Sequence, residues 1–516
     1  MEGQLEFALP GGARARAIYV LLGVTLIVFG MGIAGSFHWD DYSLFTDTAV
    51  TTPSGWTEVW QWIRTRPLTY LTFWANYLIG WQNPAGYLAV NLAMHLFGIW
   101  LLYGILHRLI GDPAAIIAAA LFALHPMQAE PVLYVFERAT LLSTIFCLLC
   151  WRSWLNRRYW PAVGWFALAL LAKEECVAFP LFLLFFERAI RPVAAMLGLS
   201  LAAGIRVIAS LAALHVAAIA PVATAAAGAA AKGAAPYAAT LSAVTFSYFR
   251  ASLLPYLCTQ GLVLLRYFRM LIFPYGFSVD PDIPLVLDWR GWAAWAAILG
   301  VAIVLWKRTA HGKWFAAGLL LLLPSSSIFP AADMAADRRL YLPMVALGAF
   351  AGLLLKGPRL RLAAIPLLLA LAAVSSTRTG VWRTERALWS EAVERGPRKV
   401  RPMLQLSRAS EPEVALRILD GAERVAPADY RPLVEKGLRL LALNRPDQAL
   451  PEFERALILL PNDPEILNDR GVALTFLGRP DEAAEDFRRV LGMNPCMAAA
   501  RRNLGRLGMT YPNTCP

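Results

Sequence analysis

The chain has 516 residues, of which 58% are hydrophobic and 16% are charged, and its formal net charge is +12. A mean hydropathy of +0.50 is too high for a soluble globular protein of this size, so the composition predicts a polytopic membrane protein with a soluble C-terminal part. The excess of basic residues, 48 against 36 acidic ones, does not indicate a nucleic-acid partner. Most of them lie in short loops between apolar runs, where the positive-inside rule accounts for them.

The first predicted element is an almost unbroken apolar run from Ala17 to Phe37. It is long enough to cross a bilayer as one helix of about 20 residues. Arg14 and Arg16 precede it, which predicts a cytoplasmic N-terminus and an exit on the outer side. The run is too long for a cleavable signal and has no small-residue cleavage pattern, so we expect it to remain as an anchor.

Two adjacent aspartates, Asp40 and Asp41, follow the exit of this helix. Like-charge repulsion and partial desolvation favour different protonation states for two such carboxyl groups, which is how a site acquires a base and a second polar group. The alternative is a solvated start of a loop, since acidic residues often follow a transmembrane helix.

Ten further apolar runs follow, and their alternate ends carry the basic residues expected on the cytoplasmic side. A cytoplasmic N-terminus and an external C-terminus require an odd number of crossings. We therefore expect 11 spans, or 13 if two short helices in the alanine-rich segment 220–274 also cross. The ten runs lie near 85–106, 113–131, 132–151, 160–172, 175–187, 193–219, 290–306, 314–330, 340–356 and 361–376.

From about residue 395 the composition becomes charged and helical, with an internal period of 34 residues. Small residues at fixed positions and a proline at the end of each second helix resemble tetratricopeptide repeats, here three repeats and a capping helix over 395–508. Such arrays form a concave surface that commonly holds peptides; the alternative is a rigid scaffold with no ligand. The period is carried by Pro412, Pro446 and Pro480, by Pro427, Pro461 and Pro495, by Ala415, Ala449 and Ala483, and by Gly437, Gly471 and Gly505.

These features predict an all-α protein with a membrane domain over 1–376, a linker over 377–394 and a periplasmic repeat domain over 395–516. Cys496 and Cys515 bracket the capping helix on the predicted oxidising side, where a disulfide is expected and two free thiols are the alternative. The other four cysteines lie in apolar segments and are expected to be small buried hydrophobic residues.

Several ionisable residues lie inside or against the apolar runs at the predicted outer face, and Arg138 and Lys173-Glu174 are the clearest cases. An ionised side chain in a membrane span costs about 2.5–3.5 kcal/mol or more unless it has a partner or faces water. Internal ion pairs that only hold helices together are one explanation. So many acids and bases at one face instead suggest a water-accessible cavity for a polar or anionic substrate.

Short motifs at these outer ends form an ordered set along the chain. They are Trp39-Asp40-Asp41, Arg66-Pro67-Leu68-Thr69, Asn76-Tyr77, Asn91-Leu92 with His95, His125-Pro126 with Glu130-Pro131-Val132, Glu137-Arg138-Ala139-Thr140, Lys173-Glu174, Phe273-Pro274 with Asp280, and Asp337-Arg338-Arg339-Leu340-Tyr341. The set resembles the TMTC-type family of membrane O-mannosyltransferases, within the GT-C superfamily of glycosyltransferases. Two departures bear on the choice of acceptor: Glu137-Arg138-Ala139-Thr140 stands where the family tends to have Gly-Arg-Ala-Asp, and Glu175 stands in place of glutamine. The repeat array is also short for the family.

The resemblance implies a GT-C helical bundle and a donor whose sugar, in this family mannose, is joined by phosphate to a polyprenyl lipid. The acceptor would be a Ser or Thr hydroxyl of an exported protein. A carboxylate can take the proton of such a hydroxyl as it attacks the anomeric carbon, and direct displacement inverts that carbon. The lipid phosphate that leaves needs positive charge to stabilise it.

The resemblance also assigns roles to residues of this chain. Asp40 or Asp41 is the candidate base, with Asp40 favoured by the match to related acidic pairs, and Glu130 is a second carboxylate that orients the acceptor. His125 orients a carboxylate or caps a helix end, and Glu174 and Tyr341 support the site. The candidates for the donor phosphate are Arg138, Lys173, Arg266, Arg269 and Arg338.

Arginine suits phosphate because its planar fork binds two oxygens at once, although snorkelling to the membrane interface is the alternative for each arginine. Asp40, Asp41 and Glu130 could hold one divalent cation through oxygen ligands. We expect no metal and no cofactor, because the mannosyl-transferring relatives are thought not to need one and basic residues supply the same charge.

The expected partners are the lipid bilayer, the polyprenyl-phosphate sugar and an acceptor peptide held by the repeats. We expect the bacterial inner membrane, with the repeats in the periplasm; an endoplasmic reticulum protein would place the same face in the lumen. Two other functions stay open: the same donor chemistry on a lipid or glycan acceptor, and a membrane-anchored repeat adaptor or transporter without chemistry.

Overall fold

The computed structural model describes residues 13–61, 64–80, 82–230, 237–326 and 333–512, and of residues 13–15, 211–230 and 237–252 it describes the backbone alone. The elements of this part are α-helices and short 3-10 helices, as the all-α prediction requires. The chain divides into two compact units. The first comprises Met1–Ala213 and Phe249–Ala387, and the second comprises Leu214–Tyr248 and Leu388–Pro516.

Five helices of the described residues are long and apolar enough to cross a membrane, which supports a multi-pass membrane protein. A sixth candidate is the pair Asp112–Leu124 and Pro126–Leu133, which bends by 51°. The bend follows from Pro126, because proline has no N–H to continue a helix and prefers a helix start. The five candidate spans are Arg16–Ala34, Pro84–Ile110, Ile190–Ser210, Trp289–Arg308 and Pro358–Val381.

The predicted count of 11 spans is not reproduced by helix length and composition. Three predicted spans correspond to shorter apolar helices: α9 (Tyr159–Ala172), α14 (Gly312–Leu322) and α15 (Met344–Leu355). A helix of 11 to 14 residues is about 17–21 Å long, which is less than the hydrocarbon thickness of a bilayer. The predicted span 175–187 is divided between a 3-10 helix and the five-residue helix α10 (Phe179–Leu183).

The alanine-rich segment 220–274 includes residues outside the described part of the chain. Its described backbone is helical, in α11 (Ile190–Ala230) and α12 (Tyr237–Ile272). Whether it crosses the membrane twice or not at all stays a prediction.

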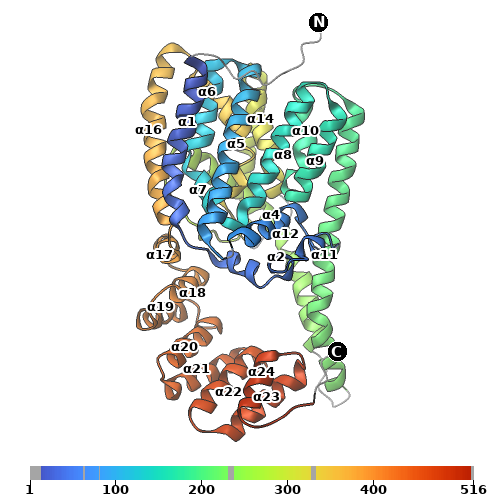
Figure 1. Cartoon of the computed structure of the whole chain (residues 1–516), viewed down its shortest axis with the longest axis vertical. Helices are drawn as coiled ribbons and strands as arrows, with labels where there is room; N and C mark the ends of the chain where they lie inside the picture. Colours follow the sequence, from blue (N-terminus) through green and yellow to red (C-terminus); the bar gives the residue numbers. More distant parts are fainter. Residues whose placement is uncertain (1–12, 62–63, 81, 231–236, 327–332, 513–516) are drawn as a thin grey trace. The chain divides into compact units, whose positions relative to one another are not determined.

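The first unit is built around α5 (Pro84–Ile110), which packs against α1 (Ala13–Gly30), α6 (Asp112–Leu124) and α8 (Arg138–Leu155) (Figure 1). Helix α6 packs closely on α15, where a Cβ on Gly352 would lie 2.4 Å from the carbonyl oxygen of Ala114. Helices α8 and α9 also pack along each other.

Four of the eleven predicted site residues lie in three short 3-10 helices between the long helices, and a fourth such helix holds Glu137. Side chains of a 3-10 helix do not follow the 3.6-residue repeat of an α-helix. These segments also bring distant parts of the chain together at helix ends. They are η2 (Trp39–Phe45), η4 (Val135–Glu137), η5 (Glu174–Ala178) and η7 (Asp337–Leu340).

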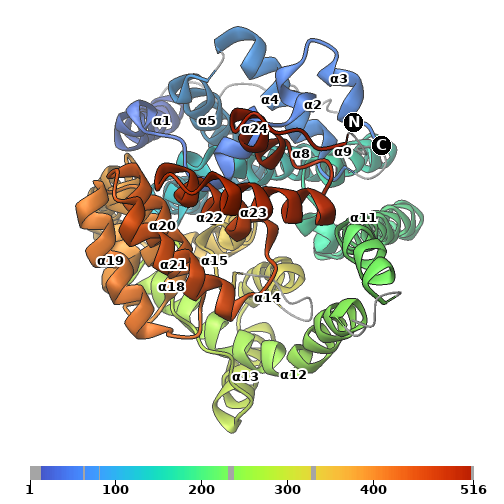
Figure 2. The same ribbon diagram turned by 90° about the horizontal axis from the view of Figure 1, so that it is seen from below.

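The second unit contains the repeats, whose consecutive helices pack on one another in chain order (Figures 1 and 2). The predicted small residues lie where paired helices meet: a Cβ on Gly437 would lie 2.5 Å from the ring of Phe453, and Gly471 faces Phe487 in the same way. The helices are α18 (Val400–Arg408), α19 (Pro412–Val425), α20 (Arg431–Ala442), α21 (Pro446–Leu459), α22 (Pro464–Phe476), α23 (Pro480–Met493) and α24 (Ala498–Arg506).

Two predictions concern the flanks of this repeat array. The predicted linker contains the last turn of α16 (Pro358–Val381) and most of α17 (Glu385–Arg395). Cys496 is disulfide-bonded, but its predicted partner Cys515 lies outside the described residues, so the pairing stays a prediction.

Candidate active site

The segment of residues 38–41, here called the aspartate loop, is fastened to the chain that follows α16. The His38 ring places Nε2 at 2.9 Å from the carbonyl oxygen of Trp382, and the backbone N–H of Trp39 donates to Glu385 Oε1 at 3.1 Å. Burial lowers the pKa of His38 to about 4, so its ring is neutral near pH 7. Since a carbonyl oxygen only accepts, the neutral ring donates from Nε2.

Asp41 is buried and serves the structure of this loop. Its Oδ2 accepts from the backbone N–H of His38 at 2.9 Å, and its Oδ1 accepts from the N–H of Phe136 at 2.8 Å. Burial raises the pKa of Asp41 to about 8, with a further contribution from the charge of Asp40. Asp41 therefore caps η2 and joins it to η4.

Asp40 is exposed, and its environment differs from that of its neighbour. Its Oδ2 accepts a hydrogen bond of 3.0 Å from the hydroxyl of Tyr134. The ring of Tyr134 packs on the indole of Trp39 with 4.5 Å between ring centroids. Of the two carboxyl groups, Asp40 is thus the one that a substrate can reach.

A second group of charges surrounds Lys173, which is buried at the end of α9. Its Nζ lies 2.9 Å from Glu137 Oε2, 2.8 Å from Thr140 Oγ1 and 3.3 Å from Glu175 Oε2. Burial opposes ionisation of Glu137, but the charges of Lys173 and Arg338 outweigh it and lower its pKa to about 2. Lys173 and Glu137 therefore form a charged pair.

Arg338 joins three carboxylates from different parts of the chain. Its Nε lies 3.0 Å from Glu137 Oε1, its Nη2 lies 2.8 Å from Asp333 Oδ2, and its Nη1 pairs with Glu130. Its backbone N–H also donates to Glu130 Oε2 at 3.0 Å. Burial opposes the charge of Arg338, but these carboxylates raise its pKa, so it stays a cation. The predicted residues Glu130, Lys173 and Arg338 are thus brought into one network through Glu137.

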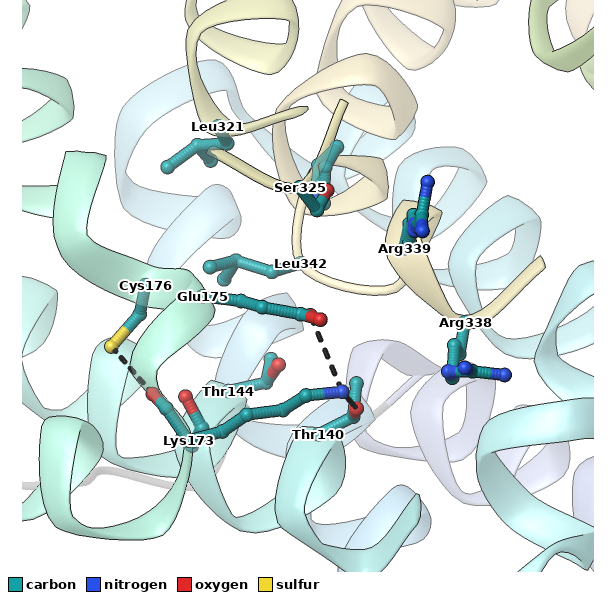
Figure 3. A pocket seen from close by; sticks show the side chains of 12 residues that line it. Thr140, Thr144, Lys173, Glu175, Cys176, Leu321, Ser325, Arg338, Arg339 and Leu342 are labelled. Atoms are coloured by element: carbon teal, nitrogen blue, oxygen red, sulfur yellow. Dashed lines mark hydrogen bonds and ion pairs between the residues drawn. The ribbon is translucent and has the colours of Figure 1, made fainter. Parts of the chain in front are cut away.

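These charges border a hollow, here called the charged pocket and shown in Figure 3. In Figure 3 the side chains of Glu175 and Lys173 point toward each other, and Arg338 and Arg339 lie together to one side. The lining consists of Thr140, Ser143, Thr144, Lys173, Glu175, Cys176, Leu321, Ser325, Arg338, Arg339, Leu342 and Pro343. The lining includes three cations and four hydroxyl groups, which suits an anionic ligand such as a phosphate.

Neither aspartate lines the charged pocket, but one short segment connects it to the aspartate loop. Tyr134 contacts Asp40, and three residues later Glu137 contacts Lys173. Three peptide units span at most about 11 Å, so the two regions are neighbours.

Glu174 lies beside this network and pairs with Arg66. The guanidinium Nε and Nη2 of Arg66 lie 3.0 and 2.6 Å from the two carboxylate oxygens of Glu174. Burial opposes ionisation of Glu174, but Arg66 lowers its pKa to about 2. The pair joins η5 to the start of α4 (Pro67–Gly80).

Arg138 does not line the charged pocket. It is fully buried, and its guanidinium donates to Asn91 Oδ1 at 2.9 Å and to the carbonyl oxygens of Tyr87 and Thr72 at 3.0 and 3.2 Å. It also lies over the ring of Phe73, 4.7 Å from the centroid. These contacts hold α4, α5 and α8 together.

Arg266 and Arg269 also lie apart from the charged pocket. Arg266 donates to the carbonyl oxygen of Gly276 at 3.0 Å, and its Nη1 is 3.9 Å from Asp337 Oδ1. Arg269 is exposed and lies over the ring of Tyr275, 4.9 Å from the centroid. Both arginines fasten the end of α12 to the loop that follows it.

The two remaining supporting residues have contacts inside the bundle. His125 Nδ1 accepts from the backbone N–H of Met127 at 3.3 Å, so it caps the 3-10 helix that Pro126 starts. The hydroxyl of Tyr341 lies 2.8 Å from His95 Nδ1, and both are buried.

Within the described ranges, the structure has no group of three or more His, Cys, Asp or Glu side chains placed to hold a metal ion.

Sequence reasoning missed Tyr134, Asp333 and Arg339 as members of the site. Arg339 stood in a quoted motif, and Tyr134 lies between two of them, so a search for polar residues in the motifs and between them would have found both. Asp333 lies outside every motif, and only its contact with Arg338 identifies it.

The chain is similar over part of its length to several known proteins. The chain is 37% identical over 120 residues to "Protein O-mannosyl-transferase Tmtc1" of Drosophila melanogaster, which covers 22% of this chain and 14% of that protein. It is 33% identical over 120 residues to human "Protein O-mannosyl-transferase TMTC3", covering 21% of this chain and 13% of that protein. Human "Protein O-mannosyl-transferase TMTC4" is 28% identical over 222 residues, covering 34% and 30%. The chain thus spans less than a third of the length of these relatives.

The tetratricopeptide repeat family matches residues 434–495 and 468–510. A thermophilic TPR protein of Thermus thermophilus with a solved structure is 22% identical, with a TM-score of 0.22, over 41% of this chain and 97% of that chain. The predicted resemblance is therefore confirmed: the chain is a distant relative, over part of its length, of the TMTC protein O-mannosyltransferases, and it carries C-terminal tetratricopeptide repeats.

Proposed function

We propose that this chain is a membrane glycosyltransferase that moves a sugar, in the first instance mannose, from a polyprenyl phosphate to Ser or Thr hydroxyls of exported proteins. The observation that carries the proposal is the exposed carboxylate of Asp40. It is fixed by Tyr134 at the exit of the first span and lies one short segment from a pocket lined by three cations. The relationship to protein O-mannosyltransferases supports the same reaction.

In this proposal Asp40 is the general base. Its carboxylate takes the proton of the acceptor hydroxyl while the hydroxyl oxygen bonds to the anomeric carbon. The bond from that carbon to the phosphate oxygen breaks, and the lipid phosphate leaves with the electron pair. One direct displacement inverts the anomeric centre. The role of Asp41 is to hold the loop, since its two oxygens already accept backbone hydrogen bonds.

The charged pocket is the proposed site of the donor phosphate, with Lys173 and Arg338 as its cations and Arg339 beside them. Both cations carry carboxylate partners, so an incoming phosphate must replace some of them. The partners best able to leave are Glu175 and Asp333, whose side chains are 35% and 23% exposed, whereas Glu130 and Glu137 are buried. The phosphate then takes the place of these two carboxylates beside the cations, and no buried charge is left unpaired.

We also propose the membrane topology of the chain. The N-terminus is cytoplasmic, 11 or 13 spans follow, and the aspartate loop and the repeats face the periplasm of a bacterium. The repeats present the acceptor peptide, as their concave surface suits an extended chain. The reaction needs no metal, because Lys173 and Arg338 supply the positive charge that stabilises the leaving phosphate.

The test is to incubate the purified chain with a panel of polyprenyl-phosphate sugars and an extract of exported proteins, then to locate modified residues by mass spectrometry. We expect sugar on Ser or Thr residues with one donor of the panel. A folded protein that transfers no sugar from any of them would refute the proposal.

Deleting residues 396–516 separates the two acceptor classes. If the repeats present the acceptor, the deletion abolishes transfer to protein while hydrolysis or transfer to small hydroxyl acceptors persists. Undiminished glycosylation of protein would show that the repeats do not present it.

A further inference from the structure

Tyr134 has a position that neither the family motifs nor the charged network explains. It is the residue between α7 (Ala129–Leu133) and η4. Its backbone is extended (φ −101°, ψ 115°), so it belongs to neither helix. The ring is buried, with 2% of its surface exposed, yet its hydroxyl lies 3.0 Å from Oδ2 of the exposed Asp40. A buried donor thus reaches the one accessible carboxylate of the aspartate loop.

The position of the Tyr134 ring is fixed from several directions. Trp39 packs on it with 4.5 Å between centroids, and Trp382 lies on another side at 6.1 Å. Its backbone carbonyl accepts from Asn91 Nδ2 at 3.2 Å, and its N–H donates to the carbonyl oxygen of Glu130 at 3.1 Å. The hydroxyl therefore has little freedom to follow Asp40 elsewhere.

The protonation of Tyr134 suits a permanent donor. Burial raises the pKa of its phenol, and the nearby charges of Asp41 and Asp40 raise it further. The group stays protonated through the physiological range and can only donate to the carboxylate.

Asp40 itself has an asymmetric set of contacts. Its Oδ2 is occupied by Tyr134, and among the residues that the structure describes no other hydrogen bond to this carboxylate is found. Its side chain is exposed, so Oδ1 is the atom that an incoming hydroxyl meets.

We propose that Tyr134 is a positioning residue for the base: its hydroxyl binds Oδ2 of Asp40 and directs Oδ1 toward the acceptor hydroxyl. The inference rests on the proposed function and adds to it a residue that sets the geometry of proton transfer.

The test replaces Tyr134 by phenylalanine in the full-length chain and compares the rate of sugar transfer with the wild type. Losing a hydrogen bond to a charged group lowers kcat by about 10- to 100-fold, while KM for the polyprenyl-phosphate sugar stays within about twofold. The pH–rate profiles of the two proteins are compared as well, because loss of a contact to the reacting carboxylate changes the profile, whereas a purely structural loss of activity does not.

Tyr87→Phe is the matched control. Tyr87 is equally buried, but its hydroxyl has no hydrogen-bond partner in the part of the chain that the structure describes, so this substitution removes the same atom without removing a hydrogen bond. We expect unchanged kcat, KM and pH profile for Tyr87→Phe. The thermal midpoints of both variants in detergent are measured to compare their folds.

The outcomes separate this inference from the proposed function. If the wild type transfers sugar and Tyr134→Phe keeps both its kcat and its pH profile, the inference is wrong and the proposed function stands. A fall in kcat with an unchanged pH profile and a lowered thermal midpoint assigns Tyr134 a structural role and also overturns the inference. If the folded wild type transfers no sugar, both proposals fail.

Discussion

The aspartate loop and the charged pocket hold their charged groups in opposite ways, although at most about 11 Å of backbone joins them. In the loop, Asp40 is exposed, and among the described residues its carboxylate has one hydrogen bond, from Tyr134. In the pocket, Lys173 and Arg338 are each held by two or more carboxylates. The loop therefore offers an atom ready to take a proton, whereas the pocket offers charge that becomes available only when partners exchange.

The difference indicates what each region can tolerate. Removing the partner of a buried ion lowers the free energy of unfolding by several kcal/mol, because the remaining charge stays desolvated. Neutralising an exposed carboxylate changes the free energy of unfolding little. Substitutions in the loop should therefore affect chemistry more than folding, and substitutions in the pocket should affect both.

The largest effect is expected from Asp40→Asn. Removing a general base lowers the transfer rate by about 10²- to 10⁴-fold, and the thermal midpoint should not change because the side chain is exposed. Asp41→Asn is the contrasting variant: it leaves one buried backbone N–H without an acceptor and lowers stability by about 1–3 kcal/mol. Equal loss of activity and stability in the two variants would contradict the distinction drawn between the aspartates.

The next largest effect is on stability, from Arg338→Gln. The substitution leaves Glu130 and Glu137 without a cation they share, which costs about 3–5 kcal/mol of the free energy of unfolding. Thermal unfolding in detergent measures it. Arg290→Gln is the control, because Arg290 pairs with Asp288 at the surface and its loss should leave the midpoint unchanged. Equal midpoints for the two variants would show that the network does not hold the fold.

A smaller effect is expected from Lys173→Met. Loss of a charge-assisted contact to phosphate raises KM for the polyprenyl-phosphate sugar by about 10-fold or more. Adding Glu137→Gln removes the unpaired carboxylate, so the double variant should regain thermal stability but not donor affinity. Arg269→Gln, outside the pocket, should leave KM unchanged. A double variant that regains both would assign Lys173 a structural role alone.

A further effect is the pH dependence of stability that Asp41 contributes. Its pKa in the folded state, about 8, lies above the value of 3.8 in an unfolded chain, so the folded state binds more protons between these values. Its contribution is complete below about pH 4 and is lost as the pH rises through about 8. The thermal midpoint of the wild type relative to Asp41→Asn should therefore fall from pH 5 to pH 9. An unchanged difference over that range would show that Asp41 is ionised in the fold.

The repeats could be predicted from the sequence because their pattern is local. A spacing of 34 residues places Gly437 and Gly471 at corresponding positions, and the structure shows each against a phenylalanine ring of the paired helix. The bend at Pro126 follows equally from a local rule, that proline starts helices and does not continue them. The five or six candidate spans of the described residues were harder to predict, because the sequence of an apolar run does not show where its helix is interrupted.

The charged site could be predicted only in part, because its contacts join distant segments. Arg138 and Arg338 look alike in the sequence, yet Arg138 points into the bundle toward Asn91, whereas Arg338 lies in the pocket beside Glu130, 208 residues away. The difference between Asp40 and Asp41 has the same origin: Phe136 lies 95 residues from Asp41 and makes it a structural group. Sequence patterns identify the ionisable residues, and the long-range contacts decide their roles.

The most direct measurement follows the sugar itself. A polyprenyl-phosphate sugar labelled at the anomeric carbon is incubated with the purified full-length chain and a Ser/Thr-rich peptide, and NMR reports the configuration of the product. We expect labelled sugar on the peptide hydroxyl with the anomeric configuration opposite to that of the donor, and transfer slowed by about 10²- to 10⁴-fold with Asp40→Asn. A product that retains the donor's configuration, or undiminished transfer by Asp40→Asn, would contradict the proposed mechanism.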